Sequence, residues 1–536
     1  MFHFKRKQIM KYLLTLLTCL LLLSSCSKFL EEYSTDQKYL ETTEDVNKVM
    51  IGEAFMNNVY SLSFYSPATM GSITSDTDLS APWLHVMDDD TEAFVLGAAD
   101  RDQATPLYML SGFHNWAQNP TVNIIGTAWN DVMWKKIYKR IGTVNALIYQ
   151  ASEIAAKNPA DANLQHLRGE AYFLRAYYYF LLQNIYGSPY RKATAATDEG
   201  VPLKISEKVE DVYFKRTNNE TVYNQIVSDL NQAADFLQGY NPTTKIRVGI
   251  AAVKCLQSRV YLFTEQYDKV LQVTNGYENM GYSITDLKRY VAKSNFTSRS
   301  STETIFTMGT NSIPAVFPND SLTSYAPANR LASSFKASDN LIQRFNSNDL
   351  RLNACFMLSA KSKAFLPAKW RTWSTYNDPE QVSCIFSFRL PEMLLNRAEA
   401  QAMLGADGEA WSEIQKLQAM RFNNNADNQQ PASNQALVNF IRDERRREFC
   451  FEGHRWFDLR RYEVNSKYPL GADFTIKHPT YSYDAQTNTY TLAGNYVLNS
   501  IAQDAPSWQV PIPNYAIEFN RGSLTNPIRS VRNIQP

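Results

Sequence analysis

The sequence predicts a fold dominated by α-helices, in which paired helices form a scaffold that packs with a long-loop irregular region containing few short strands. Two observations lead to this fold class. Apolar residues recur at helical spacing over several long segments, and these segments come in pairs separated by short polar gaps. The stretches between the pairs are long, polar and aromatic, without helical or strand periodicity. No Gly/Ser-rich or Pro-rich linker divides residues 42–536, so they are predicted to form a single domain.

The first group of predicted helices spans about residues 127–275. Its opening segment, residues 127–154, carries an apolar stripe at i, i+3 and i+4 steps made of Trp129, Met133, Ile137, Ile141, Val144 and Ile148. The next segment should end at Gly187 and Pro189, which are helix stop signals. A third begins at a capping residue, either Asn218 or Asn219, and pairs with residues 249–273.

The second group of predicted helices spans about residues 383–462. It contains the segments "CIFSFRLPEMLLNRAEAQAML", "DGEAWSEIQKLQAMRF" and "SNQALVNFIRDERRREFCFEGHRWFDLRRY". Antiparallel pairs with Ala, Tyr and Leu at their contacts resemble tetratricopeptide repeats, although the spacing is irregular. Such pairs build a curved scaffold.

Three long stretches lack this periodicity: residues 61–120, 283–382 and 463–507. Long loops in a compact domain usually carry function, because the surrounding elements hold them in place. Residues 61–120 and 283–382 are therefore the predicted ligand-binding loop regions.

The first 25 residues have the features of a secretory signal peptide. A basic segment precedes an apolar run from Tyr12 to Leu23, which is too short to span a membrane. The run ends in Leu-Ser-Ser-Cys, the pattern of a bacterial lipobox, which predicts that Cys26 becomes the acylated first residue of the mature chain. Residues 26–41 would then be the tether, and two or more acyl chains would anchor the protein stably to a membrane. Translation could start at Met1 or at Met10.

Charge and cysteine content exclude several function classes. Removing residues 1–25 leaves 50 Lys+Arg against 53 Asp+Glu, a formal charge of −3, so no nucleic-acid partner is expected. Four cysteines remain besides Cys26, and none lies at metal-ligand spacing from another. They are expected to be buried small hydrophobic residues, namely Cys255, Cys355, Cys384 and Cys450.

Several segments resemble the SusD/RagB family of Bacteroidota outer-membrane lipoproteins. The most specific are "GEAYFLRAYYYF" and "FEGHRWFDLRR", and "WKKIYKRIGTVNALI", "VYNQIVSDLNQAADFL" and "WQVPIPNYAIEFN" agree in order. The resemblance implies tetratricopeptide-like helix pairs packed against an irregular ligand-binding region. It also implies a lipid-anchored protein on the outer face of the outer membrane, bound to a SusC-like TonB-dependent transporter. Members capture glycans or other nutrients without catalytic residues or cofactors, and their shared motifs belong to the scaffold.

The densest group of charged residues, Arg445 to Tyr462, also permits an enzymatic interpretation. Glu444, Glu448 and Glu452 follow i, i+4 spacing, which places carboxyl groups about 6 Å apart on one helix face, near the separation in a retaining glycosidase. Neighbouring arginines (Arg445, Arg446, Arg447 and Arg455) should lower the pKa values of these acids, and a general acid needs the opposite shift. Structural ion pairs are the favoured interpretation, with His454 as a packed, hydrogen-bonded residue.

An acidic run at Asp88, Asp89 and Asp90 invites a calcium-site interpretation. It lacks the alternating ligands and central glycine of an EF-hand loop, so a solvated acidic turn is favoured and no metal is predicted.

Two loop clusters have the composition of a sugar-binding site. A sugar ring presents an apolar C–H face and a rim of hydroxyl groups, so its binders combine exposed aromatic rings with amide, acid or arginine side chains. The first cluster contains Trp83 and Trp116 with the nearby His85 and His114. The second and sharper cluster comprises Trp370, Arg371, Trp373, Tyr376 and Asn377. Trp129, Trp134 and Trp456 lie in helical register and are predicted to be core residues.

The combined prediction is a non-enzymatic surface lipoprotein that binds a nutrient, with an oligosaccharide favoured, and delivers it to a transporter. Two alternatives remain open: a surface glycoside hydrolase, and a helical scaffold that binds a protein or peptide. The sequence does not identify the glycan.

Overall fold

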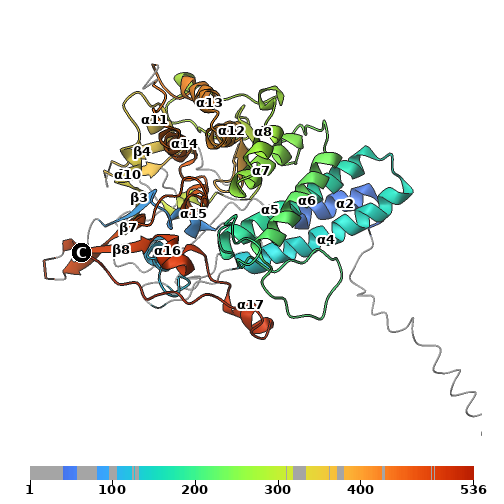
Figure 1. Ribbon diagram of the computed structural model, residues 1–536, viewed down its shortest axis with the longest axis horizontal. Coiled ribbons are helices and arrows are strands. Elements are labelled where there is room, and N and C mark those ends of the chain that lie inside the picture. Colours follow the sequence, from blue (N-terminus) through green and yellow to red (C-terminus); the bar gives the residue numbers. More distant parts are fainter. Residues whose placement is uncertain are drawn as a thin grey trace, which may run out of the picture.

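Helices that are neighbours in sequence pack side by side across most of the molecule (Figure 1). The computed structural model describes residues 40–56, 81–95, 106–122, 126, 132–309, 311–317, 333–360, 363–370, 380–424, 429–484, 486–487 and 489–536. One bundle contains α2 (Thr43–Val49), α4 (Met133–Lys157), α5 (Ala162–Tyr186) and α6 (Asn219–Phe236). A second group contains α7 (Ile250–Phe263), α8 (Tyr267–Val273), α12 (Leu390–Leu404), α13 (Asp407–Ala419), α14 (Asn434–Phe449) and α15 (Arg455–Glu463).

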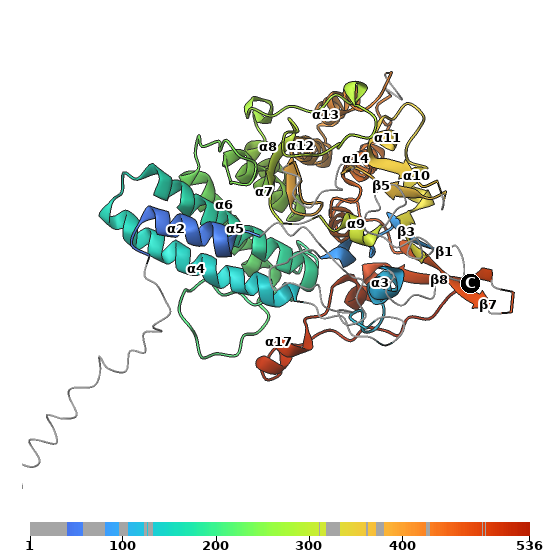
Figure 2. The same cartoon turned by 180° about the vertical axis from the view of Figure 1, so that it is seen from behind.

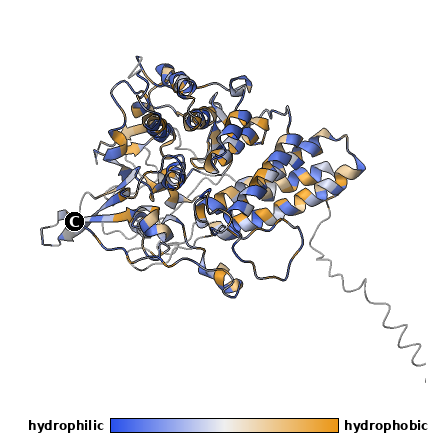
Figure 3. Ribbon diagram, viewed as in Figure 1, coloured by the Kyte–Doolittle hydropathy of each residue, from blue (hydrophilic) through white to orange (hydrophobic). Residues whose placement is uncertain are grey.

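These helices start and stop at residues with a clear physical role. Asp161, Asn218 and Ser433 accept hydrogen bonds from backbone N–H groups in the first turns of α5, α6 and α14. The predicted stop after α5 is confirmed, because the helix ends at Tyr186 and Gly187 is its cap residue. Hydrophobic and hydrophilic residues alternate along the helices of the bundle (Figure 3). Outer helices of a bundle have this pattern because they bury one face and expose the other.

α5 is the central helix of the first bundle. It contacts α4 and α6, and every residue from Phe173 to Tyr186 is buried. α5 lies close to Leu237, the residue that follows α6, because Gly169 has no side chain. A methyl group on Gly169 would lie 2.5 Å from Cγ of Leu237. A larger residue at position 169 would force these helices apart.

Strands are few and form antiparallel pairs. β1 (Thr91–Val95) pairs with β3 (Ser333–Ala337), β2 (Thr304–Thr307) with β6 (Ser387–Arg389), β4 (Phe356–Leu358) with β5 (Phe365–Pro367), and β7 (Thr475–Asp484) with β8 (Thr489–Asn499). Helix-rich architecture with few strands confirms the predicted fold class.

Short helical segments connect these elements. They are η1 (Met50–Ala54), η3 (Pro82–His85), α3 (Pro106–His114), η5 (Tyr277–Asn279), η6 (Leu287–Arg289), α9 (Ile313–Val316), α10 (Asp339–Ile342), α11 (Arg351–Cys355), α16 (Ile501–Asp504), η8 (Ala505–Trp508) and α17 (Asn514–Phe519). Among the helices of the described residues, none is long and apolar enough to cross a membrane.

The β7–β8 hairpin departs from the sequence prediction. Residues 463–507 showed no strand periodicity, yet residues 475–499 form a long two-stranded ribbon with one register shift near Thr480. One face of β7 packs on α3, where His114 stacks on His478 at 3.8 Å between ring centroids. Figure 2 shows α3 beside this hairpin. Tertiary packing, which sequence alternation does not report, stabilises the ribbon.

Candidate functional site

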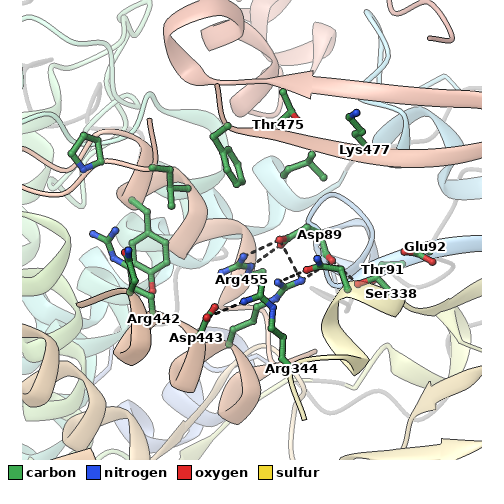
Figure 4. A pocket seen from close by; sticks show the side chains of 18 of the residues that line it. Asp89, Thr91, Glu92, Ser338, Arg344, Arg442, Asp443, Arg455, Thr475 and Lys477 are labelled. Atoms are coloured by element: carbon green, nitrogen blue, oxygen red, sulfur yellow. Dashed lines mark hydrogen bonds and ion pairs between the residues drawn. The ribbon is translucent and has the colours of Figure 1, made fainter. Parts of the chain in front are cut away.

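A pocket of about 600 Å³ lies between α14, β7, the segment leading into β1 and the segment that follows β3 (Figure 4). Its labelled side chains come from all four elements: Asp443 from α14, Lys477 from β7, Asp89 before β1 and Arg344 after β3. Segments more than 300 residues apart in sequence therefore meet around one space. Ligand sites of soluble proteins are commonly concave pockets of this size.

α14 contributes one polar face to the pocket. The lining residues of this helix are Gln435, Asn439, Arg442, Asp443 and Arg446, which follow i, i+3 and i+4 steps. Its other face enters the core through Leu437, Ile441, Glu444 and Glu448. The amides of Gln435 and Asn439 are exposed, so they can form hydrogen bonds to a ligand.

One wall of the pocket consists of ion pairs around the acidic run. Arg455 holds Asp89 with two hydrogen bonds of 2.7 and 2.9 Å, and Arg446 Nε donates to Asp90 Oδ1 at 2.6 Å. Burial alone would raise the pKa of Asp89, but the two arginines outweigh burial and lower it. Burial does raise the pKa of Asp90. The prediction of a solvated acidic turn is therefore wrong, because two arginines from the distant helices α14 and α15 cover the run.

The remaining lining combines exposed charges with an apolar wall. Arg344 and Asp443 form a 2.9 Å ion pair, with side chains 38% and 39% exposed, and Glu92 pairs with Lys336 at 3.2 Å. Lys477 is exposed. The apolar wall consists of Pro469, Leu470 and Phe474, together with Tyr462 and Ile476, which are buried. An apolar wall beside amides and charged groups suits a ligand with both an apolar face and hydroxyl groups.

The three glutamates that resembled a glycosidase pair lie outside this pocket, in the protein interior. Glu448 accepts from Arg421 at 2.9 Å and from Arg389 at 3.0 Å, and Glu444 pairs with Arg351 at 2.7 Å. Glu452 pairs with Lys369 at 2.6 Å and with Arg389. Burial alone would raise the pKa of Glu444, yet Arg351 and Arg447 hold it at about 2. A general acid needs a raised pKa and access to substrate. The pKa values of Glu444 and Glu448 are lowered, and all three carboxyl groups are buried.

Structural ion pairs were predicted here, but the partners differ from those expected. Of the four neighbouring arginines, only Arg447 pairs with one of the three glutamates. Arg445 instead binds Asp458 at 2.7 Å, and Arg446 and Arg455 bind the acidic run. The charges that hold the glutamates come from Arg351, Lys369, Arg389 and Arg421, none of which lies in the same segment.

His454 and Trp456 have the packed positions that were predicted. His454 Nδ1 lies 3.1 Å from Arg445 Nη2, and its ring stacks on Phe449 at 4.5 Å. Trp456 is buried and stacks on Trp508 at 5.2 Å. Trp134 is also buried, whereas Trp129 lies outside the described residues.

Two family profiles match separate parts of the chain. The profile described as "Starch-binding associating with outer membrane" matches residues 96–262, and that of the SusD family matches residues 354–528. Together they span more than half of the sequence. The chain belongs to the SusD/RagB family.

Solved structures of SusD/RagB relatives share this fold. A putative sugar binding protein from Bacteroides vulgatus is 19% identical, with 92% of this chain and 100% of that chain covered and a TM-score of 0.64. A SusD superfamily protein from Bacteroides thetaiotaomicron is 19% identical over 90% and 98%, with a TM-score of 0.62. Surface glycan-binding protein A from Bacteroides fluxus is 17% identical over 92% and 99%, with a TM-score of 0.60. No curated protein matches the sequence.

Three of the aromatic residues predicted to bind ligand lie in the core of this SusD/RagB protein. Trp83 and Trp116 are each 1% exposed, and Trp370 is 4% exposed. Trp83 stacks on Phe113 at 5.3 Å, and the Trp116 indole N–H donates to the Met87 carbonyl at 2.9 Å. The expectation that these rings are exposed is wrong. Trp83 packs on α3, Trp116 stacks on His478 of β7, and Trp370 belongs to the hydrophobic core.

The other predicted site residues lie outside the described residues. They are Arg371, Trp373, Tyr376 and Asn377 of the second aromatic cluster and Cys26 of the lipobox. Their roles remain predictions.

The SusD/RagB resemblance assigned α14 to the scaffold, and for that reason its pocket face was missed. A polar stripe at Gln435, Asn439, Arg442 and Arg446, opposite an apolar stripe, was the available signal. Only the fold shows that this stripe lines a pocket and is not open solvent-exposed surface.

The four cysteines of the described residues are buried, as predicted. Cys255, Cys355, Cys384 and Cys450 are buried free thiols. Within the described ranges, no cluster of histidine, cysteine and acidic side chains has the arrangement of a metal site.

Proposed function

We propose that this protein is a non-enzymatic outer-membrane lipoprotein that binds a glycan at the cell surface and delivers it to a SusC-like TonB-dependent transporter. One observation carries the proposal: in a SusD/RagB fold, the pocket on α14 combines exposed amides, charged groups and an apolar wall. That combination matches the hydroxyl rim and the C–H face of a sugar. The names of two relatives, a putative sugar binding protein and a surface glycan-binding protein, support it.

Attachment to the membrane is assigned to Cys26. Its lipobox follows the apolar run of the signal peptide, and one family profile is described as associating with the outer membrane. Acylation at Cys26 would leave residues 27–39 as a tether before the first described residue, Leu40. We place the body on the exterior face, where a polymeric nutrient is first available.

The second aromatic cluster is proposed as an additional stacking surface. Trp373 and Tyr376 supply aromatic rings, and Arg371 and Asn377 supply hydrogen-bond donors. Trp370, at the start of the same segment, is buried and anchors it to the body.

The structure does not favour the first alternative, a glycoside hydrolase, because its candidate catalytic residues are buried. Glu444 and Glu448 are fully buried among arginines, so neither can reach a substrate. A peptide-binding scaffold remains a second candidate, and it predicts capture of a protein partner without glycan affinity.

Calorimetric titration of the mature chain against a glycan panel tests the proposal. Asn439→Ala should weaken binding by about 1 kcal/mol, because it removes one hydrogen-bonding amide from the pocket. Trp373→Ala should cost at least about 1 kcal/mol if its ring stacks on the sugar. Asn163→Ala, at an exposed helical asparagine outside the pocket, should leave affinity unchanged.

Each result has a clear consequence. Unchanged affinity in Asn439→Ala would remove the pocket from the site, and unchanged affinity in Trp373→Ala would remove the aromatic cluster. Absence of binding to every glycan would overturn the proposed function, and release of reducing ends by purified protein would show a hydrolase instead.

A further inference from the structure

We propose that the pocket on α14 selects an anionic saccharide, one whose sugars carry carboxylate or sulfate groups. This inference rests on the proposed function, since it names the class of glycan that the pocket would take. It depends on the balance of charge around the pocket and on two cations that have no carboxylate partner of their own among the described residues.

Cations outnumber acids in the pocket lining. The cationic side chains are Arg344, Arg442, Arg446, Arg455 and Lys477, and the acidic ones are Asp89, Glu92 and Asp443. Each of these acids already has a partner: Arg455 holds Asp89 at 2.7 Å, Lys336 holds Glu92 at 3.2 Å and Arg344 holds Asp443 at 2.9 Å. The acids therefore have little remaining charge with which to repel an anion.

Arg442 is the first unmatched cation. It is 5% exposed, and its guanidinium stacks over the Tyr462 ring at 4.2 Å. Only Nη1 forms a hydrogen bond among the described residues, to the Tyr468 carbonyl at 2.8 Å, whereas Nε and Nη2 have no acceptor there. A carbonyl oxygen stabilises the guanidinium but does not neutralise its charge.

The nearest carboxylate to Arg442 is committed to another arginine. Glu399 Oε1 lies 3.9 Å from Arg442 Nε, beyond hydrogen-bond distance, while Arg461 donates to both Glu399 oxygens at 2.7 and 2.8 Å. Burial lowers the pKa of Arg442, which agrees with a charge that lacks compensation. An unneutralised charge near a partly desolvated pocket attracts counter-charge more strongly than one in open water.

Lys477 is the second unmatched cation, and it comes from a different element. It is exposed on β7 between the buried residues Ile476 and His478, and no ion pair holds it among the described residues. Figure 4 shows Lys477 on β7 and Arg442 on α14 at different sides of the same space. An anionic sugar between them would meet the exposed ammonium group of Lys477, the guanidinium of Arg344 and the amides of Gln435 and Asn439. A pocket built only for neutral sugars has no need of the two unpaired cations.

Three oligosaccharides of equal length test whether the pocket prefers an anionic to a neutral saccharide. They are an oligogalacturonate, a sulfated chondroitin fragment and a neutral malto-oligosaccharide. Calorimetric titration should show at least one acidic probe binding about tenfold or more tightly than the neutral one, which corresponds to about 1.4 kcal/mol. The chondroitin fragment carries carboxylate as well as sulfate groups, so tighter binding of it than of the oligogalacturonate indicates that sulfate adds to the affinity, and the reverse indicates that carboxylate alone is enough. Its affinity should fall as NaCl rises from about 50 mM to about 500 mM, because salt screens exposed charges.

Two substitutions assign that affinity to this pocket. Lys477→Gln should weaken the acidic probe about threefold or more and leave folding unchanged, because the side chain is exposed. Arg442→Met should weaken it about tenfold or more, with a melting temperature equal to or above that of the parent, because it removes a buried charge without a carboxylate partner. Lys157→Gln, at an exposed lysine at the end of α4, is the matched control and should bind like the parent.

Failure of the inference and failure of the proposed function would give different results. Equal binding of neutral and acidic probes, or unchanged acidic affinity in Lys477→Gln, overturns the inference and leaves the proposed function standing. If Arg442→Met does not fold, Lys477→Gln and the salt series decide. Absence of binding to all three probes and to the wider glycan panel overturns both.

Discussion

Glu448 illustrates at the scale of one residue how the interior of this protein tolerates charge. Its carboxylate lies within 3.3 Å of three guanidinium groups, from Arg351, Arg389 and Arg421, and the side chain has no exposed surface. Burial alone would raise the pKa of Glu448, but these arginines lower it well below the usual range. Burying any one of these charges alone would be prohibitive, so the acid and the arginines are stable only together.

Glu448→Gln should therefore destabilise the protein strongly. The amide keeps the shape of the side chain but removes the negative charge, which leaves three buried arginines undercompensated. The expected loss in free energy of unfolding is about 3–5 kcal/mol, measured by urea denaturation. Glu44→Gln, in an exposed pair with Lys48 on α2, should cost less than about 1 kcal/mol. A stable Glu448→Gln protein that had lost only ligand binding would contradict the structural role.

At the scale of a single element, the start of α6 shows how adjacent asparagines take different roles. Asn218 is the capping residue, and its Oδ1 accepts from the Thr221 N–H at 2.8 Å. Asn219 is buried, and its amide bonds Gln183 and the carbonyls of Ser188 and Pro189. One residue caps its own helix, and the other joins α6 to the segment that follows α5.

Alanine at these two positions should have unequal effects. Asn218→Ala loses one capping bond at an exposed helix end, which should cost about 1 kcal/mol. Asn219→Ala leaves buried polar groups without partners and should cost about 2–3 kcal/mol or more. Urea denaturation of both variants measures the difference, and equal costs would show that Asn219 is no more than a second cap.

At the scale of the whole molecule, folding buries several histidines as neutral rings. His85, His114 and His478 come from three distant segments, and His114 stacks on His478. Burial lowers the pKa of His85 to about 3 and that of His114 well below its usual value. Burial also lowers the pKa of His478 to about 4, although both ring nitrogens face carbonyl oxygens that favour the charged form.

Stability should therefore decrease as pH falls below neutrality. In the unfolded chain each histidine has a pKa of about 6.5, so the unfolded state binds protons first as pH decreases. The stabilisation is complete above about pH 6.5 and is lost progressively as pH falls toward the folded pKa values of about 3 to 4. Each neutral histidine should contribute about 1.4 kcal/mol of this loss per pH unit below about 6.

Urea denaturation from pH 7 down to about 5 measures the net slope. Burial raises the pKa values of Asp88 and Asp90, so these carboxyl groups bind protons first in the folded state and oppose the histidine slope as pH falls. Glu444, with its lowered pKa of about 2, adds a further loss only below the unfolded value of about 4.3. His85→Gln should reduce the loss of stability per pH unit by one histidine's share, and a slope unchanged from that of the parent would show that His85 is not held neutral.

The sequence by itself determined the features that depend on local spacing. The helical class, the end of α5 at Gly187, the helix start near Asn218 and the buried character of the cysteines follow from periodicity, capping and composition. The family resemblance also came from contiguous motifs. It correctly assigned the stretch from Arg445 to Tyr462 to the scaffold, but it did not show that Arg446 and Arg455 also line the pocket.

Tertiary structure alone decided which side chains meet and which are covered. Arg455 binds Asp89, which is 366 residues away, and no spacing rule reports such a pair. Trp83, Trp116 and Trp370 resembled a sugar-binding surface but are buried, because burial depends on neighbours that the local sequence does not name. The pocket likewise exists only where α14, β7 and the acidic run converge. Helix formation is governed by interactions between residues a few positions apart, so the sequence pattern predicted the helical scaffold. The pocket is formed by contacts between residues distant in sequence, so only the tertiary structure shows where it lies.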